Sequence, residues 1–327
     1  MDVAVVVVGY NDSGWLEPCL RSVLKEIRPG SVYYVDNASG DGSAGLVSDL
    51  FPGVHVVRNT VNRGFAGGNN QVLSTLVRGV GYRYVFLLNP DTVVPAGLIA
   101  GLRGFMEEFT QYGVIGPLQT EYDAKGVSDR LNRVSRRDVE IGKYHILRRW
   151  IPGVSLQVDR EAPAGVLGVY YVQGSAFFAR LDLFRDIGYF DEIYHAFFEE
   201  VDLCRRALWH GYKLGLITSL RLSHASRGAG NGSRYRIYYR IRNKYLFILT
   251  DPDLAISRLP WIVVRLIGAD LRQIPGSSTS SEFSVLSFGR AVLWLLVHAR
   301  HIARGRSRRN SMVTSTGHWA TTPDPHH

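Results

Sequence analysis

The chain has 327 residues, 46% of them hydrophobic, which is enough for one large domain with an appendage or for two domains. Its 38 Lys and Arg residues outnumber its 29 Asp and Glu residues, and the net charge of +9 suits an anionic ligand, a membrane surface or nucleic acid. The two cysteines, Cys19 and Cys204, lie far apart, so neither a disulfide scaffold nor a cysteine zinc site is indicated, and we expect a reducing compartment.

Short β-branched runs alternate with helical patterns over the first 120 residues, which predicts parallel strands joined by crossover helices. The nearly continuous hydrophobicity of each run predicts strands that are covered on both faces. The N-terminal run lacks the basic region of a signal peptide, so it is expected to be a buried strand. Pro18 is tolerated in the first turn of a helix, so the next helix is expected to start close to it. The predicted strands are 3–8, 32–35, 54–57 and 84–88.

The second half of the chain is less regular. Periodicity fades from about 120 to 168, which predicts a variable surface insertion. A strand-like run follows at 170–180, and then a helical run that Gly188 closes. A later helix ends near Gly211, and another strand-like run ends at His224. Two amphipathic helical patterns with basic polar faces come last, and no apolar run reaches the roughly 18 residues of a membrane-spanning helix.

Polar residues stand where three of the strands end. In an open α/β sheet, ligands bind outside the carboxyl ends of the strands, and Asn11, Asp36 and Asp91 all fall there. Asp36 opens the segment VDNASGDGS, in which Asn37 and small residues allow backbone amides to turn toward a ligand. Its carboxylate suits hydrogen bonds from a base or a ribose, and the alternative is an Asp that caps the next helix.

The segment NRGFAGGNN, residues 62–70, combines a cation with three glycines just before a helix. This composition suits the close approach of an anionic ligand. A full dinucleotide fingerprint of the G-x-G-x-x-G type is absent from the sequence, which disfavours a hydride-transfer enzyme. The candidate ligand-binding residues of this segment are Asn62, Arg63, Gly64, Gly68 and Asn69.

Asp91 offers a hard oxygen ligand on a short loop at the sheet edge. Magnesium and manganese prefer such oxygens and complete their shells with water and substrate phosphates. Asn89 suits orienting Asp91 or holding a ribose hydroxyl, although Asn-Pro-Asp is also an ordinary turn. His224 is a candidate metal ligand or phosphate contact, and a lone histidine is more often structural.

Glu199, Glu200 and Asp202 gather at the start of a predicted helix, where the helix dipole stabilises negative charge. Surface helices often begin this way, and Asp202 is spaced to pair with Arg206. The neighbouring Phe197, Phe198, Leu203 and Trp209 favour a functional interpretation. Carboxylates beside aromatic bulk are partly desolvated, which tunes one of them toward general-base catalysis.

Six segments, in this order, resemble the family 2 glycosyltransferases with a GT-A fold, most closely the bacterial branch of rhamnosyltransferases. The resemblance covers roughly the first three quarters of the chain, and YYRIRNK at 238–244 is a weaker match. The segments are VVGYN at 7–11, VDNASGDGS at 35–43, NRGFAGGNN at 62–70, LLNPDT at 87–92, GSAFFAR at 174–180 and FDEIYHAFFEEVDLCRRALWHGY at 190–212.

The resemblance implies an α/β fold of the GT-A type, with a Rossmann-like, mixed but mainly parallel sheet flanked by helices. It places a nucleotide-sugar-binding and catalytic domain at 1–225, which includes the insertion at about 120–168. A C-terminal helical extension is then expected at 226–310 and a disordered tail at 311–327.

Relatives of this family move a sugar from a nucleotide diphosphate donor to an acceptor hydroxyl, with inversion by direct displacement. Carried over by resemblance, Asp36 reads the nucleobase and Asp91 is the last acid of the metal-binding Asp-x-Asp motif. Glu200 matches the catalytic base, and His224 matches a ligand of the metal or diphosphate. The implied cofactor is Mg²⁺ or Mn²⁺, and the implied donor is dTDP-rhamnose in the first place or a UDP-linked sugar.

Two departures from the family pattern leave alternatives open. Asn89 replaces the first acid of Asp-x-Asp, which puts the metal affinity in question. Glu200 is one methylene longer than the usual Asp, so Glu199 or Asp202 remains an alternative base. A sugar-phosphate nucleotidyltransferase would need a basic residue after the first strand, and GYNDSGW has none. A non-catalytic nucleotide-sugar-binding module would tolerate loss of the acid cluster, which is present.

The C-terminal arginines suggest where the protein works. They flank apolar helix faces that suit either an anionic membrane surface, where lipid-linked acceptors reside, or a helical cap or dimer interface. No recognised nucleic-acid-binding module surrounds them, so nucleic acid is not an expected partner. The expected location is the cytoplasm, at the inner face of the cell membrane. The arginines are Arg265, Arg272, Arg290, Arg300, Arg304 and Arg306.

Overall fold

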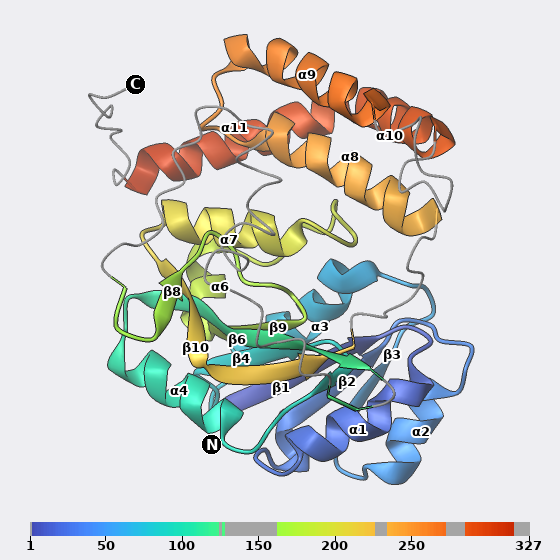
Figure 1. The fold of residues 1–327 in the computed structure, drawn as a ribbon, viewed down its shortest axis with the longest axis vertical. Coiled ribbons are helices and arrows are strands. Elements are labelled where there is room, and N and C mark those ends of the chain that lie inside the picture. The colour runs from blue at the N-terminus through green and yellow to red at the C-terminus, as the bar shows by residue number, and fades with distance from the viewer. Residues whose placement is uncertain (1, 124–125, 128–161, 226–233, 273–284, 317–327) are drawn as a thin grey trace.

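The computed structural model describes residues 2–123, 126–127, 162–225, 234–272 and 285–316. A mixed sheet with helices on both faces forms the lower part of Figure 1, and four C-terminal helices lie above it. The sheet contains β1 (Val3–Gly9), β2 (Val32–Asp36), β3 (His55–Arg58), β4 (Tyr84–Leu88), β5 (Thr92–Val93), β6 (Tyr112–Asp123), β7 (Gly126–Val127), β8 (Val166–Gly168), β9 (Ala176–Arg180) and β10 (Lys213–His224).

The strand order is β3-β2-β1-β4-β9-β6-β10-β5. β1 pairs in parallel with β2 and β4, and β2 pairs in parallel with β3, so their carboxyl ends share one edge. β9 is antiparallel to both β4 and β6, while β6 and β10 are parallel. The predicted mixed, mainly parallel sheet is therefore confirmed.

Alternate residues of β1 lie in two separate cores, as expected for a strand covered on both faces. Val3, Val5 and Val7 pack in the core with α1 and α4, whereas Ala4 and Val6 pack in the core with α3, α6 and α7. Full burial of one valine contributes about 1.5–3 kcal/mol, so this double coverage fixes the centre of the sheet. The helices are α1 (Ser13–Val23), α2 (Ser43–Leu50), α3 (Gly64–Arg78), α4 (Leu98–Glu108), α6 (Leu181–Ile187) and α7 (Glu199–Trp209).

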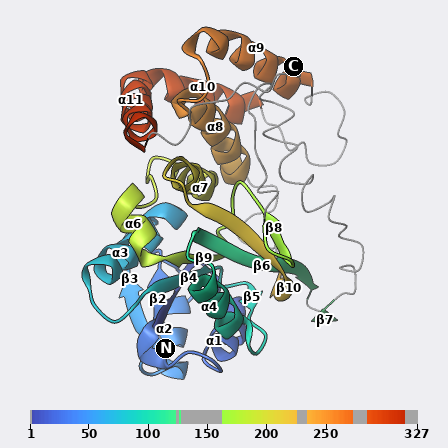
Figure 2. The same ribbon diagram turned by 90° about the vertical axis from the view of Figure 1, so that its left-hand side faces the viewer.

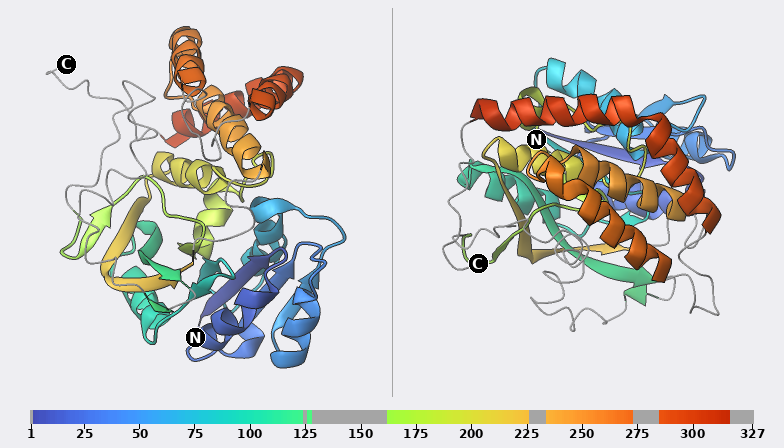
Figure 3. Two further views of the ribbon diagram at one scale, coloured as in Figure 1. Left: turned by 45° about the vertical axis from the view of Figure 1, so that its right-hand side comes forward. Right: turned by 90° about the horizontal axis from the view of Figure 1, so that it is seen from above.

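The C-terminal helices lie against α7 and form a third core of their own (Figures 2 and 3). That core also takes Tyr194, Phe198 and Val201 from the segment around the start of α7. The extension therefore shares buried side chains with the α/β part. Its helices are α8 (Arg234–Thr250), α9 (Leu259–Arg272), α10 (Val285–Val297) and α11 (Ala299–Thr316).

Several boundaries differ from those that the sequence predicted. α1 begins at Ser13, so Pro18 is the sixth residue of the helix and not part of its first turn. Pro18 and Gly14 are both exposed, so the Gly14 carbonyl, to which proline cannot donate a hydrogen bond, lies on the solvent side of the helix. Only Ala176–Arg180 of the run 170–180 forms a strand, and α11 continues to Thr316, beyond the expected start of the tail at 311. Most of the expected insertion lies outside the described residues.

Candidate active site

The loops after β1 and β2 hold each other through side-chain hydrogen bonds. Asn11, with a φ of 57°, accepts a bond from the Gly40 amide through its Oδ1 at 2.8 Å. Asp36 is buried and accepts bonds from the Ser39 amide at 3.2 Å and the Tyr34 hydroxyl at 3.4 Å. Asp36 is thus a carboxylate fixed at the edge where parallel strands end, as the sequence predicted.

Asn37 connects this edge to the start of α3. Its buried side chain donates to the Gly64 carbonyl at 3.0 Å and accepts from Asn59 at 2.9 Å. The loop before α3 is closed by Asn62, whose side chain accepts from the Gly64 amide at 2.8 Å. The ligand-binding residues predicted on β2 and on α3 are therefore neighbours.

Two glycines of α3 are required by close contacts. Gly64 has a φ of 70°, and a Cβ there would lie 2.1 Å from the His195 carbonyl oxygen. A Cβ on Gly68 would lie 2.7 Å from a methyl group of Val8. Gly64 thus lets the start of α3 touch the segment before α7, and Gly68 lets α3 pack onto β1. Arg63 precedes the helix, and the buried Asn69 donates to the Phe65 carbonyl.

Asp91 and His224 meet at the other side of the same edge. Asp91 follows β4 and is buried, and its Oδ1 lies 3.2 Å from Nε2 of His224 at the end of β10. His224 Nδ1 lies 3.0 Å from Gln119 Oε1, which also accepts a bond from the Ser175 hydroxyl. Because Gln119 Oε1 is an acceptor, Nδ1 donates a hydrogen bond to it, and Nε2 is the ring nitrogen that faces Asp91.

This pair fits a divalent cation. The second carboxylate oxygen of Asp91 is buried and has no hydrogen-bond partner among the described residues. Ligands about 2.1 Å from an octahedral ion lie about 3 Å from each other when adjacent, which matches the Asp91–His224 separation. Within the described part of the chain no three His, Cys, Asp or Glu side chains form a metal cluster. Among these residues Asp91 and His224 are the two candidate ligands, and water or substrate could complete the shell of a bound ion.

Asp12 is a further acid at this edge that the sequence analysis overlooked. Its carboxylate accepts the Tyr10 amide at 2.8 Å. Burial, together with the charges of Asp91 and Asp41, raises the pKa of Asp12 to about 6, although the hydrogen bond from Tyr10 lowers it. Asp12 lies in the loop just after β1, as Asp36 lies at the end of β2. This position at a strand end is the feature of the sequence that could have predicted it. Asn89, two residues before Asp91, is half-buried, and its backbone N–H donates to the Ser175 carbonyl at 3.1 Å.

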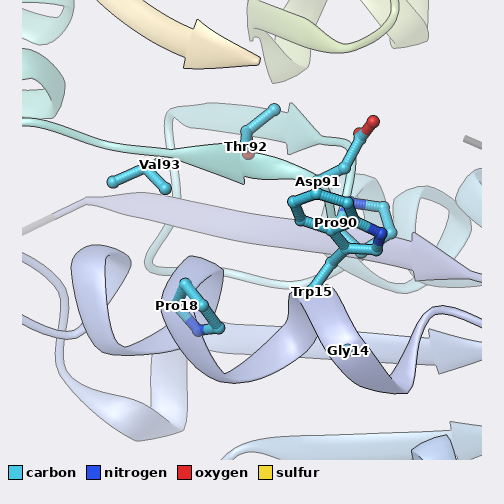
Figure 4. Close-up of a pocket in the computed structure, with 7 residues that line it drawn as sticks. All are labelled: Gly14, Trp15, Pro18, Pro90, Asp91, Thr92 and Val93. Carbon is cyan, nitrogen blue, oxygen red and sulfur yellow. The ribbon is translucent and has the colours of Figure 1, made fainter. Parts of the chain in front are cut away.

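A shallow pocket lies between the start of α1 and the Asp91 loop (Figure 4). Trp15, Pro18 and Pro90 line it, and the Asp91 carboxylate points away from the Trp15 and Pro18 rings. The carboxylate instead faces His224. Asp91 is the one predicted site residue among those that line the pocket. The pocket is therefore not the place where the predicted site residues meet.

A strained segment leads into α7. His195, Phe197 and Phe198 have φ values of 63°, 67° and 75°, which cost non-glycine residues about 1–3 kcal/mol each. Glu199 and Glu200 follow at once, at the positive end of the helix dipole. Such strain in front of two acids is typical of a functional site and requires neighbouring contacts that hold it.

The two glutamates have different environments. Glu199 is buried, and its Oε2 has no hydrogen-bond partner within the described residues. Burial, and next the neighbouring Glu200 charge, raise the pKa of Glu199 well above its ordinary value of 4.5. Glu200 is half-buried and lies close enough to Tyr171 for its charge to raise the pKa of that phenol, which burial raises first. Glu199 therefore keeps its proton more readily than an ordinary glutamate.

Asp202 is occupied by two arginines. Its Oδ2 accepts from Arg206 at 3.0 Å, and its Oδ1 accepts from Arg309 of α11 at 2.9 and 2.7 Å. All three side chains are buried, and Arg309 also reaches Asp191 at 2.9 Å. Despite its burial, these partners lower the pKa of Asp202. Removing one member of such a buried pair costs about 3–5 kcal/mol, so Asp202 joins α7 to α11.

Comparison with known proteins agrees with this arrangement. The family model for "Glycosyl transferase family 2" matches residues 4–159. An N-acetylglucosaminyl-diphospho-decaprenol L-rhamnosyltransferase of Mycobacterium tuberculosis is 25% identical over 257 residues, which cover 75% of this chain and 83% of that protein. The low-salt glycan biosynthesis hexosyltransferase Agl10 of Haloferax volcanii is 22% identical over 279 residues, 81% of this chain and 85% of its own.

Solved structures show the same fold. The mannosyltransferase PcManGT of Pyrobaculum calidifontis, in complex with GDP-Man and Mn²⁺, aligns over 97% of this chain and 87% of its own with a TM-score of 0.54 and 15% identity. TarS 1-349 of S. aureus in complex with UDP-GlcNAc aligns over 98% and 93% with a TM-score of 0.52 and 16% identity.

The fold and the relatives define a glycosyltransferase of the GT-A type. Residues 4–159 match glycosyltransferase family 2, and the chain is similar to a rhamnosyltransferase, as the sequence motifs predicted.

The raised pKa of Glu199 predicts a pH-dependent effect of Glu199→Gln. Below pH 4.5 both the folded and the unfolded chain hold the proton, so this group costs no stability. As the pH rises toward the raised pKa of the folded state, the unfolded chain releases the proton first and folding becomes less favourable. We expect the Tm of Glu199→Gln to exceed that of the wild type by more at pH 8 than at pH 5. Thermal unfolding across this range measures the difference.

The matched control is Glu108→Gln, because Glu108 is exposed at the end of α4. Its Tm difference from the wild type is expected to stay constant with pH. A Glu199→Gln difference that is equally flat would contradict the buried, proton-retaining state of Glu199.

Proposed function

We propose that this glycosyltransferase moves a sugar from a nucleotide diphosphate donor to an acceptor hydroxyl by direct displacement with inversion. The observation that supports this most strongly is the pair formed by Asp91 and His224, in which a buried carboxylate oxygen lacks a partner among the described residues. The pair lies on the sheet edge that also carries Asp36. A divalent cation, Mg²⁺ or Mn²⁺, held by this pair would neutralise charge on the leaving diphosphate.

The donor-binding part of the site would extend from Asp36 to the start of α3. Asp36 offers a fixed acceptor for the amide or hydroxyl groups of a base or ribose, and Asn11 and Asn37 shape the loops beside it. The exposed ring of Tyr10, next to Asn11, offers a face for base stacking. Gly64, Gly68 and the neighbouring Asn62, Arg63 and Asn69 would approach the phosphates closely, and Asn89 would orient Asp91 or hold a ribose hydroxyl.

Glu200 is the proposed general base. Asp202 is excluded from this role in the proposal because Arg206 and Arg309 bind both of its oxygens. Glu199 is buried, its Oε2 included, so it is less accessible to an acceptor hydroxyl than Glu200. Glu200 follows the strained segment, is half-buried and is therefore accessible enough to take the proton from an acceptor hydroxyl.

The proposed donor is dTDP-rhamnose, with a UDP-linked sugar as the alternative. The similarity to a rhamnosyltransferase supports this choice. The name of that relative includes N-acetylglucosaminyl-diphospho-decaprenol. We propose that the acceptor of the present chain is also a hydroxyl of a lipid-linked molecule. The proposal includes a location in the cytoplasm at the inner face of the cell membrane.

The surface of the C-terminal helices supports the membrane contact. Trp261 and Val264 of α9 are three residues apart and 53% and 67% exposed, so they share one helix face. On α11 the exposed Arg300, Arg304 and Arg308 recur every four residues. No described helix is both long and apolar enough to cross a bilayer. The exposed apolar residues in this part of the chain are Ile256, Trp261, Val264, Leu286, Leu293, Leu296 and Val297.

Not every arginine expected at the membrane faces outward. Arg306 is half-buried and donates to the carbonyls of Leu249, Asp251 and Leu254, so it is part of the helical core. Arg290 is exposed, and its guanidinium lies over the Tyr238 ring. The contact with anionic lipid is therefore assigned to the exposed arginines of α11 together with the apolar residues of α9 and α10.

Donor binding tests the proposed function directly. A panel of dTDP-rhamnose, UDP-GlcNAc and GDP-mannose is added to the wild type with and without Mn²⁺, and Tm is measured. We expect dTDP-rhamnose with Mn²⁺ to stabilise the fold by about 2.7 kcal/mol at a hundredfold excess over Kd. The manganese-dependent part of the shift should disappear in Asp91→Asn. A Tm shift that is the same with and without Mn²⁺, and the same in Asp91→Asn as in the wild type, would refute the assigned metal site.

The identity of the base is tested by Glu200→Gln. This variant should bind the donor with the wild-type Kd, because Glu200 acts on the acceptor. Its transfer rate should fall by roughly 10²- to 10⁴-fold, the contribution of a general base. Release of nucleoside diphosphate in the presence of a synthetic N-acetylglucosaminyl-diphospho-polyprenol measures the rate, with Glu108→Gln as the control. Wild-type turnover in Glu200→Gln would remove it from the mechanism.

Membrane contact is tested by flotation with vesicles. Vesicles that contain phosphatidylglycerol should carry the protein upward at low salt, whereas pure phosphatidylcholine vesicles should not. Each exposed arginine near such a surface contributes about 1 kcal/mol, and salt screens it. Val264→Ser should weaken flotation, while Val80→Ser, 98% exposed on the α/β part, should leave it unchanged. Equal flotation of both variants would contradict the assigned surface.

A further inference from the structure

The segment 193–198 is strained and yet ordered against two different helices. On one side, the His195 carbonyl accepts from the Ala66 amide of α3 at 3.4 Å and occupies the space that a side chain at Gly64 would need. On the other side lies α8. The segment therefore has the donor-binding start of α3 on one side and the C-terminal helices on the other.

Two buried residues of α8 bind the carbonyls of this segment. The Asn243 side-chain amide donates to the carbonyls of Tyr194, Ala196 and Phe197 at 2.9, 2.7 and 2.6 Å. Arg242 donates to the carbonyls of Ile193 and Tyr194 at 2.6 and 2.7 Å. Four of the five carbonyls from Ile193 to Phe197 are thus bound by two neighbouring side chains.

The two residues also fix each other. Arg242 donates from its Nε to the Asn243 side-chain oxygen at 2.7 Å, which leaves the Asn243 amide hydrogens for the carbonyls. The Arg242 guanidinium lies over the rings of Tyr239 and Trp294, 4.5 and 4.4 Å from their centroids. A lysine has one ammonium in place of the planar fork and cannot make this set of contacts.

We propose that Arg242 and Asn243 are positioning residues of the transfer reaction, which hold segment 193–198 in the conformation that presents Glu200 to the acceptor. The inference rests on the proposed function, because it assumes that Glu200 is the base. Left-handed backbone at His195, Phe197 and Phe198 persists only where the surroundings enforce it, and these side chains supply the enforcing contacts.

Hydrogen exchange tests the clamp without any substrate. The variants are Asn243→Ala and Arg242→Lys in the full chain. The control is Leu246→Ala, which removes a buried apolar side chain from α8 that is not among the residues bonded to the segment. Amides in a peptide that spans 190–200 should exchange faster in the clamp variants than in the control. Equal exchange in all three would overturn the proposal.

Kinetics test the positioning role. With dTDP-rhamnose as donor and the synthetic diphospho-polyprenol acceptor, kcat of Asn243→Ala should fall by about 10- to 100-fold, the effect of a small displacement of a catalytic group. The Kd for the donor should stay at the wild-type value. At assay temperatures well below its Tm, Leu246→Ala should keep the wild-type kcat. An unchanged kcat in Asn243→Ala, or an equal loss in Leu246→Ala, overturns the positioning role. If the wild type does not turn over, the proposed function fails, and hydrogen exchange alone decides whether the clamp exists.

Discussion

Asp202 and its two arginines are the interaction on which the geometry of this enzyme depends. Asp202 lies in the first turn of α7, two residues after Glu200, and binds Arg206 of its own helix and Arg309 of α11. A buried charge that lost one of these partners would destabilise the fold strongly, so α7 has one allowed position relative to α11. The direction in which Glu199 and Glu200 leave the helix start is fixed by the same constraint.

The sheet supplies the other half of the site through its topology. β1, β2 and β4 are parallel, so the residues that follow them must lie along one edge. β10 brings His224 to that edge because it pairs with β5, where His224 stands opposite Thr92. A sheet with β10 reversed would place His224 at the far edge, so the Asp91–His224 pair depends on strand order and not on local sequence.

The elements that depend on local sequence patterns were predicted well. The four N-terminal strands match within about one residue, because continuous apolar runs bounded by turn residues admit few other structures. Asn11, Asp36 and Asp91 were predicted at the sheet edge from strand ends alone. The family resemblance added a proposed role for each acid, and the contacts of Asp202 with two arginines distinguish it from Glu199 and Glu200.

Other residues were beyond prediction because their partners come from distant parts of the chain. Gln119 lies within a strand and orients His224, 105 residues away, without any local signal. Arg242 and Asn243 stood out only as part of a basic run, and their carbonyl partners lie 46 to 49 residues earlier. Pro18 was misplaced for a different reason, since the expectation ignored that an exposed helix face tolerates a lost hydrogen bond.

The boundary predicted at 225 divides the chain by topology but not by energetics. Tyr194 is fully buried in the core that the C-terminal helices form, and Phe198 and Val201 pack against it. If α8 to α11 were removed, these side chains would lose their apolar neighbours and Asp202 would lose Arg309. The carbonyls of Ile193, Tyr194, Ala196 and Phe197 would lose Arg242 and Asn243. We therefore regard residues 234–272 and 285–316 as part of the same unit as the candidate site, and any movement of the C-terminal helices at a membrane surface would act directly on segment 193–198, which leads into Glu200.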